Sequence, residues 1–385
     1  MSHILLPKGF EVELFTGRPD GTVVGCSAEV ASTFSDFVTE PDRRNLEYTT
    51  PPEASYGQQR RLLLEPRRRL RPWLRERQLT LLPGSTLSLG DSSHFERSDP
   101  QNPYHGYIEA TYGTRVVTAS VHINLGYSTM PELFAGLRLM RCEAALLLAL
   151  SASSPFLDGH ATGAHSQRWL QFPLTPPTVP LFTDHADYVR WMEEQLAAGS
   201  MQNVRHLWTS VRPNGDQRPH QLNRIEIRIC DLIADPDVLL AVTAFAELRL
   251  QQLLRHPDAH DPLRASVLTA AALAELADAN DRAAARLSLA ATLRHWRTGE
   301  PIEAAAWIRQ DMEELAPLAE ELGLTGVLAP LRAVLQEGNQ AMRWLRRHRE
   351  GESIAAIVAA DARAMEDWEE RASEPDATDE RAPLG

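Results

Sequence analysis

The sequence predicts an α+β protein in which a mostly antiparallel sheet precedes a helical region. Four short stretches within the first 230 residues alternate apolar and polar residues, the pattern of half-buried strands. From Asp237 to about Arg371, Ala, Leu, Glu and Arg recur at helical spacing. We therefore expect one domain over residues 1–370, sheet-rich over 1–236 and helical over 237–370, and a disordered acidic tail over 371–385.

The predicted strands lie at residues 10–14, 45–49, 115–124 and 224–230, and each has one apolar and one polar face. If they pair in one sheet, the apolar face packs on a core and the polar faces form one surface. That surface would carry Glu11 and Glu13, then Glu47, then Thr118, Ser120, His122 and Asn124, and finally Arg224, Glu226 and Arg228.

Carboxylates crowded on one sheet face repel each other unless cations lie between them. Magnesium prefers hard oxygen ligands, and Glu11, Glu13, Glu47 and Glu226, with Glu40 shortly before Glu47, are of that type. A single Glu pair on a strand is also typical of a solvated face, and a lone histidine such as His122 is typical of a hydrogen-bonded core residue. The recurrence of the pattern on four strands favours a metal site.

Composition excludes several other classes of protein. The formal net charge of −13 argues against a dedicated nucleic-acid binder. The three cysteines show no CxxC spacing, which fits a reducing compartment. The sequence shows neither a signal peptide nor an apolar run long enough to span a membrane, so we expect a cytoplasmic protein.

Lys8 is the only lysine among 39 basic residues. A Walker A motif requires a lysine after its second glycine, and a pyridoxal Schiff base would have to use Lys8 itself. Phosphate groups must therefore be bound by arginines and metal ions, and together with the carboxylates this favours nucleotide-dependent phosphoryl transfer. Arg228, two residues after Glu226 on the same face, could meet the phosphoryl group.

Helices are expected at 27–37, 57–77, 131–152 and 184–199, and five more after residue 237, with breaks near residues 256–262, 280, 299–301, 323–325 and 351. Pro66 and Pro72 should break the second helix into short pieces. Its many arginines could bind nucleic acid, but an acid-paired or solvated helix face is the favoured interpretation. Residues 151–169 form a polar loop too long for a simple connection, which is typical of a functional loop.

Several segments together resemble the glutamate–cysteine ligases, of the cyanobacterial type and near the bacterial carboxylate–amine ligases. In order along residues 8–300 they are GFEVELF, NLEYTTPP, TASVHINLG, LALSASSPFLDGHATG, RHLWTSVRPNG, NRIEIRICDL and AAARLSLAATLRHW. The resemblance implies a curved sheet similar to that of glutamine synthetase, whose concave face binds two or three magnesium ions and ATP. It also implies that glutamate is phosphorylated on its γ-carboxylate and that the amine of cysteine then displaces phosphate.

The resemblance assigns roles to individual residues. The implied metal ligands are Glu11, Glu13, Glu40, Glu47, His122 and Glu226, with Asp42 competing for the place of Glu40. Glu226 and Arg228 match the family's Glu-x-Arg pair at the transferred phosphoryl group. Candidates for contacts with ATP or substrate are Arg168, Arg212, Arg228, Asn124 and Arg115, although alternation points Arg115 away from His122.

A non-catalytic binding module that has kept the fold is the least favoured alternative, because a binding role does not need the whole set of Glu11, Glu13, Glu47, His122, Glu226 and Arg228. Two enzymatic alternatives to the glutamate–cysteine ligase hypothesis stay open. A ligase of the same mechanism could join another acid and amine, because the matching motifs bind metal and nucleotide. A guanidino phosphotransferase could use the same architecture. All three use small-molecule substrates, and the sequence does not fix the oligomeric state. We expect Glu226→Ala to lower turnover by orders of magnitude without unfolding the protein.

Overall fold

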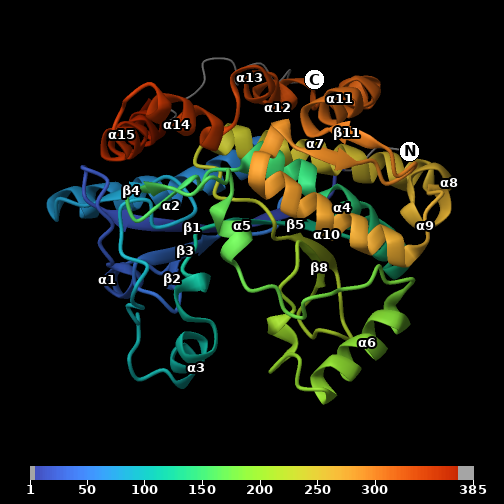
Figure 1. The fold of residues 1–385 in the computed structure, drawn as a ribbon, viewed down its shortest axis with the longest axis horizontal. Coiled ribbons are helices and arrows are strands. Elements are labelled where there is room, and N and C mark those ends of the chain that lie inside the picture. Colours follow the sequence, from blue (N-terminus) through green and yellow to red (C-terminus); the bar gives the residue numbers. More distant parts are fainter. Residues whose placement is uncertain (1–4, 372–385) are drawn as a thin grey trace, which may run out of the picture.

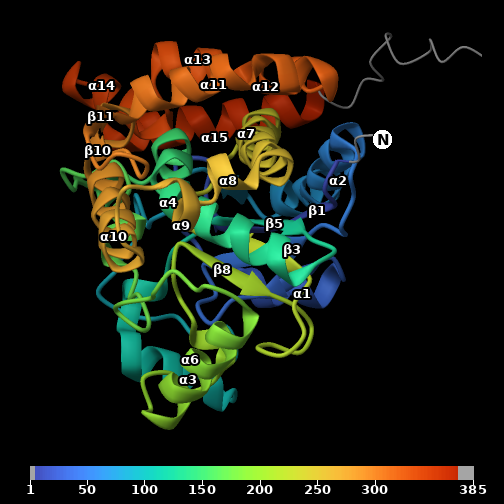
Figure 2. The same ribbon diagram turned by 90° about the vertical axis from the view of Figure 1, so that its right-hand side faces the viewer.

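An antiparallel sheet of seven strands lies at the centre of the computed structural model, which describes residues 5–371. Helices α4, α7 and α10–α15 lie on one side of this sheet, and α3 and α6 lie on the other (Figures 1 and 2). The strand order is β2-β3-β1-β5-β9-β8, and β4 pairs with β1. The strands are β1 (Lys8–Gly17), β2 (Phe37–Thr39), β3 (Asn45–Thr49), β4 (Thr80–Leu82), β5 (Val121–Gly126), β8 (Val211–Asn214) and β9 (Arg224–Ile227).

Two small hairpins stand apart from this sheet: β6 (Phe156–Leu157) with β7 (His160–Ala161), and β10 (Thr292–Arg294) with β11 (Pro301–Glu303). The helices up to the end of the sheet are α1 (Ser27–Thr33), α2 (Tyr56–Glu76), α3 (Pro103–Tyr112), α4 (Met130–Ser151), α5 (Gln167–Gln171) and α6 (His185–Ala197). The later helices are α7 (Pro236–Arg255), α8 (Pro257–His260), α9 (Pro262–Ala265), α10 (Ala270–Leu287), α11 (Ala304–Glu321), α12 (Thr325–Leu328), α13 (Pro330–Glu337), α14 (Gln340–Arg349) and α15 (Ile354–Arg371).

The apolar face of the sheet packs against the helical layer. Phe10, Val12 and Leu14 of β1 are at most 2% exposed, and they belong to one core cluster with residues of α4 and α7. Alternation then turns the residues between them to the opposite face, the side of the sheet on which α3 and α6 lie (Figure 2). The predicted α+β class and the two-faced antiparallel sheet are confirmed.

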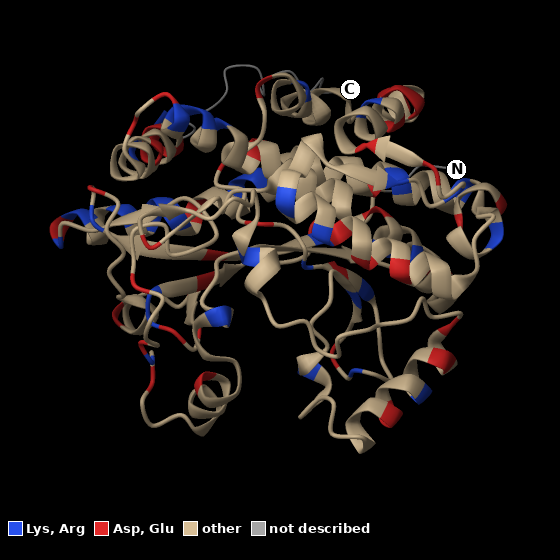
Figure 3. Cartoon of the chain, in the orientation of Figure 1, with Lys and Arg blue, Asp and Glu red and all other residues tan. Residues whose placement is uncertain are grey.

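Acidic residues of α15 pair with the arginine-rich helix α2. Arg67 and Arg71 are buried against Glu369, at 2.5 and 2.7 Å, and the exposed Arg75 pairs with Glu366 at 2.6 Å. Figure 3 shows the charged residues of these two neighbouring helices. The acid-paired interpretation of this arginine run is therefore confirmed.

Several predicted elements are wrong in detail. In place of the five helices expected after residue 237, the described residues form nine, α7 to α15, and the helix expected at 27–37 ends at Thr33. Helix α2 continues through Pro66 and Pro72, because the buried Leu63, Leu70 and Leu74 and the pairs with α15 hold it in place. Helix α10 likewise continues through Asn280. The strand expected at 115–124 begins only at Val121, since residues Gly113–Val116 form a 3₁₀ turn.

The extent of the domain stays a prediction, and the predicted tail lies, apart from Arg371, outside the described residues. None of the helices in residues 5–371 combines the length and the apolar character that crossing a membrane requires.

Candidate active site

Antiparallel pairing brings the predicted polar residues together on the open face of the sheet. In the strand register Glu11 lies opposite His122, and Glu13 lies opposite Glu47. On the next pair of strands Asn124 lies opposite Glu226. Side chains of directly opposed residues are neighbours, so four strands together build one polar floor.

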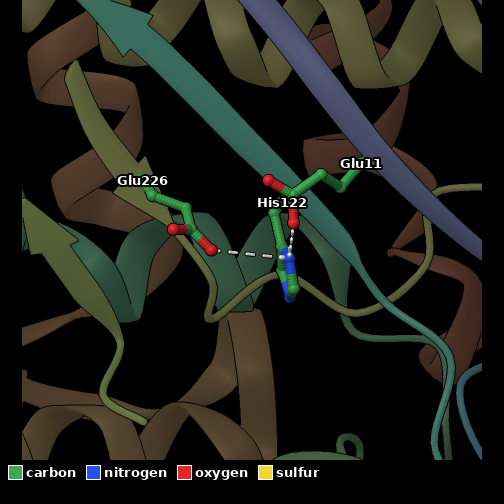
Figure 4. Close-up of side chains that lie close together, drawn as sticks. All are labelled: Glu11, His122 and Glu226. Atoms are coloured by element: carbon green, nitrogen blue, oxygen red, sulfur yellow. Dashed lines mark hydrogen bonds and ion pairs between the residues drawn. The ribbon is translucent and has the colours of Figure 1, made fainter. Parts of the chain in front are cut away.

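The first cluster consists of Glu11, His122 and Glu226 (Figure 4). Nδ1 of His122 lies 2.8 Å from Oε2 of Glu11 and 3.6 Å from Oε1 of Glu226. Glu226 is fully buried, and it accepts hydrogen bonds from Nε and Nη2 of Arg212 at 2.7 and 3.0 Å. It also contacts Arg228. Burial alone would raise the pKa of Glu226, but the charges of Arg212, Arg228 and His122 lower it well below its usual value. This carboxylate is therefore ionised at neutral pH.

The second cluster consists of Glu13, Glu40 and Glu47, whose carboxylate oxygens lie within 4.8 Å of one another. Burial raises the pKa of Glu13, and it raises that of Glu47 strongly, with a further contribution from the charge of Glu40. The neighbouring Asn45, 3% exposed, has a buried Oδ1 without a hydrogen-bond partner. Three carboxylates and an unsatisfied carbonyl oxygen suit a divalent cation with oxygen ligands, because such a cation removes the repulsion among them. Both clusters therefore fit magnesium, the second by its donor set more closely than the first, which includes an imidazole.

Arg168 reaches the site from α5 and is fixed by an internal hydrogen-bond network. Its Nη1 and Nη2 donate to the backbone carbonyls of Ile229 and Arg228 at 3.1 and 3.0 Å. The fully buried Asp231, 3.9 Å from Nη1 of Arg168, accepts hydrogen bonds from the hydroxyls of Ser154 and Ser166, both at 2.7 Å. The long polar loop therefore anchors Arg168 and the end of β9.

A cavity of about 870 Å³ lies above the polar floor. Its lining includes five of the six predicted metal ligands, and six arginines: Arg168, Arg205, Arg212, Arg218, Arg224 and Arg228. The lining also includes the aromatic residues Tyr104, Phe172 and Trp208. The volume is in the range of pockets that hold a drug-sized or cofactor-sized ligand, and the charges suit a ligand that carries both anionic groups and metal ions.

Comparison with known proteins identifies the family. The model of glutamate–cysteine ligase family 2 matches residues 8–360. The chain belongs to this family. The resemblance seen in the sequence is thereby confirmed.

Among curated members of the family, a protein of Gloeobacter violaceus provisionally named glutamate–cysteine ligase 2 is 29% identical over 69% of this chain and 69% of its own length. A Micrococcus luteus protein of the same provisional name is 28% identical over 63% of this chain and 60% of its own length, so that match spans less than two thirds of the relative.

Two solved structures share the fold. The glutamate–cysteine ligase of Francisella tularensis, crystallised with AMP, has a TM-score of 0.72 at 14% identity and covers 95% of this chain and 89% of its own. A bifunctional glutathione synthetase of Pasteurella multocida has a TM-score of 0.73 at 16% identity and covers 94% of this chain but only 52% of its own.

Most of the predicted family residues lie at the site, but Arg115 does not. It is exposed in the 3₁₀ turn, its Nε donates to the carbonyl of Tyr112, and it does not line the cavity. Asn124 lies on the floor and donates from Nδ2 to Oε1 of Glu11 at 3.2 Å. Arg212 is bound to Glu226 rather than free for substrate, and burial followed by the charge of Arg228 lowers its pKa to about 10.

Three residues of the site were missed by the sequence reasoning. Asn214, two residues after Arg212 on β8, donates to Oε2 of Glu226 at 2.6 Å, and the i, i+2 spacing could have identified it. Arg205 and Arg218 line the cavity from a turn and a loop, where no periodicity marks them.

Proposed function

We propose that this protein is an ATP- and magnesium-dependent ligase that joins the γ-carboxylate of glutamate to the amine of cysteine. The products are γ-glutamylcysteine, ADP and phosphate, and the reaction would be the first step of cytoplasmic glutathione biosynthesis. The observation that carries the proposal is the pair of acidic clusters lying side by side on one cavity floor with Arg228, in a chain of this ligase family.

The reaction has two steps. A γ-carboxylate oxygen of glutamate attacks the γ-phosphorus of ATP, so that ADP leaves and an acyl phosphate forms. The amine nitrogen of cysteine then attacks the acyl carbon, phosphate leaves with the acyl oxygen, and the nitrogen loses a proton. Magnesium, when bound, neutralises charge on the phosphates and on the developing acyl phosphate.

The residues of the chain supply the rest of the site. Glu11, His122 and Glu226 would hold one metal ion, and Glu13, Glu40 and Glu47 would hold another. Arg228, 12% exposed, lies in the cavity lining beside the first cluster, where it can stabilise charge on the transferred phosphoryl group. Arg168, held by backbone carbonyls, keeps the end of β9 and therefore Arg228 in place.

The test is ADP formation by the purified protein with ATP, magnesium and glutamate, with and without cysteine and with each other amino acid. We expect ADP release that requires both glutamate and cysteine. No cysteine-dependent release would refute the cysteine assignment, and release with a different amine would identify the related ligase instead. An N-phosphorylated product formed from ATP and a guanidino compound such as arginine, in the absence of glutamate, would indicate the guanidino phosphotransferase. Arg190→Gln, an exposed arginine on α6 that pairs with Asp187 outside the cavity, is the control.

A further inference from the structure

Two arginines of the cavity lining have no acidic partner. Arg205 comes from the 3₁₀ turn Val204–His206, and Arg218 from the loop between β8 and β9. Within the described residues 5–371, neither guanidinium contacts an acceptor, and Nη1 of Arg218 is buried without a hydrogen bond. A buried N–H donor without a partner is costly, so this group points to a ligand that is bound in the working enzyme.

The other arginines of the cavity already have partners within the protein. Arg212 and Arg228 are bound to Glu226, and Arg168 is bound to backbone carbonyls. Arg224 donates to the side chains of Asn124 and Asn223. Among the six arginines of the cavity lining, Arg205 and Arg218 are therefore the two whose guanidinium groups make no hydrogen bond or ion pair with residues 5–371.

The surroundings of Arg218 favour an anion. Burial lowers the pKa of Arg218; the negative charge of the buried Glu226 opposes this shift, and the positive charges of Arg228 and Arg205 add to it. Glu226 already pairs with Arg212 and Arg228, so the positive charges of Arg205 and Arg218 exceed what this one carboxylate compensates, and an anionic ligand beside them would be stabilised. Guanidinium groups also match phosphate oxygens with two parallel hydrogen bonds.

The order of the strands indicates which substrate this anion belongs to. Arg205 and Arg218 flank β8, at one end of the sheet, next to the β9 residue Glu226 of the first cluster. The acidic cluster with Glu40 and Glu47 lies toward β2 and β3, whereas the arginines of the cavity lining come from α5 and from β8, β9 and the segments beside these strands. The substrate with the highest negative charge therefore fits the β8 end.

We propose that Arg205 and Arg218 form a clamp for the triphosphate of ATP. The clamp rests on the proposed function, because that function supplies the nucleotide. In this arrangement the nucleotide lies with its phosphates toward β8. The carboxylate and amine substrates lie toward β2 and β3. A carboxylate of the acid substrate is the rival anion.

The test measures nucleotide binding directly, by calorimetry with ATP and Mg²⁺ in the absence of acid and amine. We expect Arg218→Gln and Arg205→Gln each to raise the Kd for ATP about tenfold, the loss expected for a charge-assisted hydrogen bond. The Kd of Arg218→Lys for ATP should lie between those of the wild type and Arg218→Gln, since lysine keeps the positive charge but cannot form two parallel hydrogen bonds. The two glutamine variants should also bind inorganic tripolyphosphate more weakly than the wild type does. Their binding of adenosine should be unchanged. Arg190→Gln should bind ATP like the wild type.

Two results would overturn the clamp. One is an ATP Kd within twofold of wild type in both glutamine variants at unchanged thermal stability. The other is an effect confined to the KM of the carboxylate substrate, which would assign the arginines to that substrate. Because the titration contains no amine, it stays decisive even if cysteine-dependent ADP formation fails.

Discussion

Replacing Glu226 tests the centre of the site, and the structure changes what this replacement should do. The carboxylate is fully buried and is held by Arg212, Arg228 and Asn214. Removing one partner of a buried ion pair costs about 3–5 kcal/mol, because the other charge is left without compensation. The expectation that Glu226→Ala leaves the folded protein intact is therefore revised: the structure predicts that this variant loses stability as well as activity.

Glu226→Gln is the sharper variant, because the amide keeps the volume and one oxygen acceptor. We expect its free energy of unfolding to fall by about 1–3 kcal/mol in urea titrations. We expect kcat/KM for ATP to fall at least about a thousandfold, or about 4 kcal/mol of transition-state stabilisation, since the first cluster loses an anionic ligand.

Glu143→Gln is the matched control. Glu143, 1% exposed on α4, pairs with Arg249 at 2.6 Å and accepts from Nε1 of Trp296 at 2.9 Å, away from the cavity. It should lose stability as Glu226→Gln does and keep its turnover per folded molecule. A Glu226→Gln enzyme with near wild-type kcat/KM, or an equal loss of activity in Glu143→Gln, would contradict the role of Glu226 in the first cluster.

Three further outcomes follow from the structure. Lys8→Met should lower the free energy of unfolding by about 3–5 kcal/mol, because Nζ of the fully buried Lys8 lies 3.2 Å from Oε2 of Glu247. It should leave kcat unchanged, because Lys8 does not line the cavity. Chemical denaturation and activity assays check the two outcomes. Burial and the charges of Arg249 and Arg297 lower the pKa of His260 to about 4, from 6.5. Between these values the unfolded chain binds the extra proton, so this contribution to stability is complete above about pH 6.5 and declines toward pH 4 by about 3 kcal/mol. Urea titrations at pH 7 and pH 4.5 should show this decline in the wild type and less of it in His260→Gln; equal declines would contradict it. Asp231→Asn should lower kcat more than it raises the KM for ATP, because it weakens the hydrogen bonds that support Arg168 and the end of β9 and leaves the nucleotide clamp intact. A change confined to the KM for ATP would argue against this positioning role.

The floor of the site was predictable because it follows from strand periodicity. Once Glu11 and Glu13 are placed on one face of a strand, antiparallel pairing leaves few positions for His122, Glu47 and Glu226. The resemblance then assigned chemistry to that face. Periodicity has no counterpart in turns and loops, which is why Arg205 and Arg218 were missed. Arg115 was a candidate through the resemblance alone, although strand alternation pointed it away from His122, and it lies in a 3₁₀ turn.

Tertiary contacts explain the errors in the helices. Proline disfavours a helix interior locally, yet α2 continues through Pro66 and Pro72 because its arginines pair with α15, a helix about 300 residues later in the chain. Asn280 does not end α10, because its side chain exchanges two hydrogen bonds of 2.9 Å with the backbone of Arg294 in the β10–β11 hairpin. Neither partner can be inferred from the local sequence.

Isotope transfer from glutamate to phosphate tests the central claim most directly. Glutamate labelled with ¹⁸O in its γ-carboxylate is incubated with ATP, magnesium, cysteine and the enzyme, and the inorganic phosphate is analysed by mass spectrometry. An acyl phosphate intermediate requires one ¹⁸O atom per phosphate released, because the carboxylate oxygen that attacked ATP leaves with the phosphoryl group. Phosphate without ¹⁸O, formed while γ-glutamylcysteine accumulates, would contradict the mechanism proposed for this site.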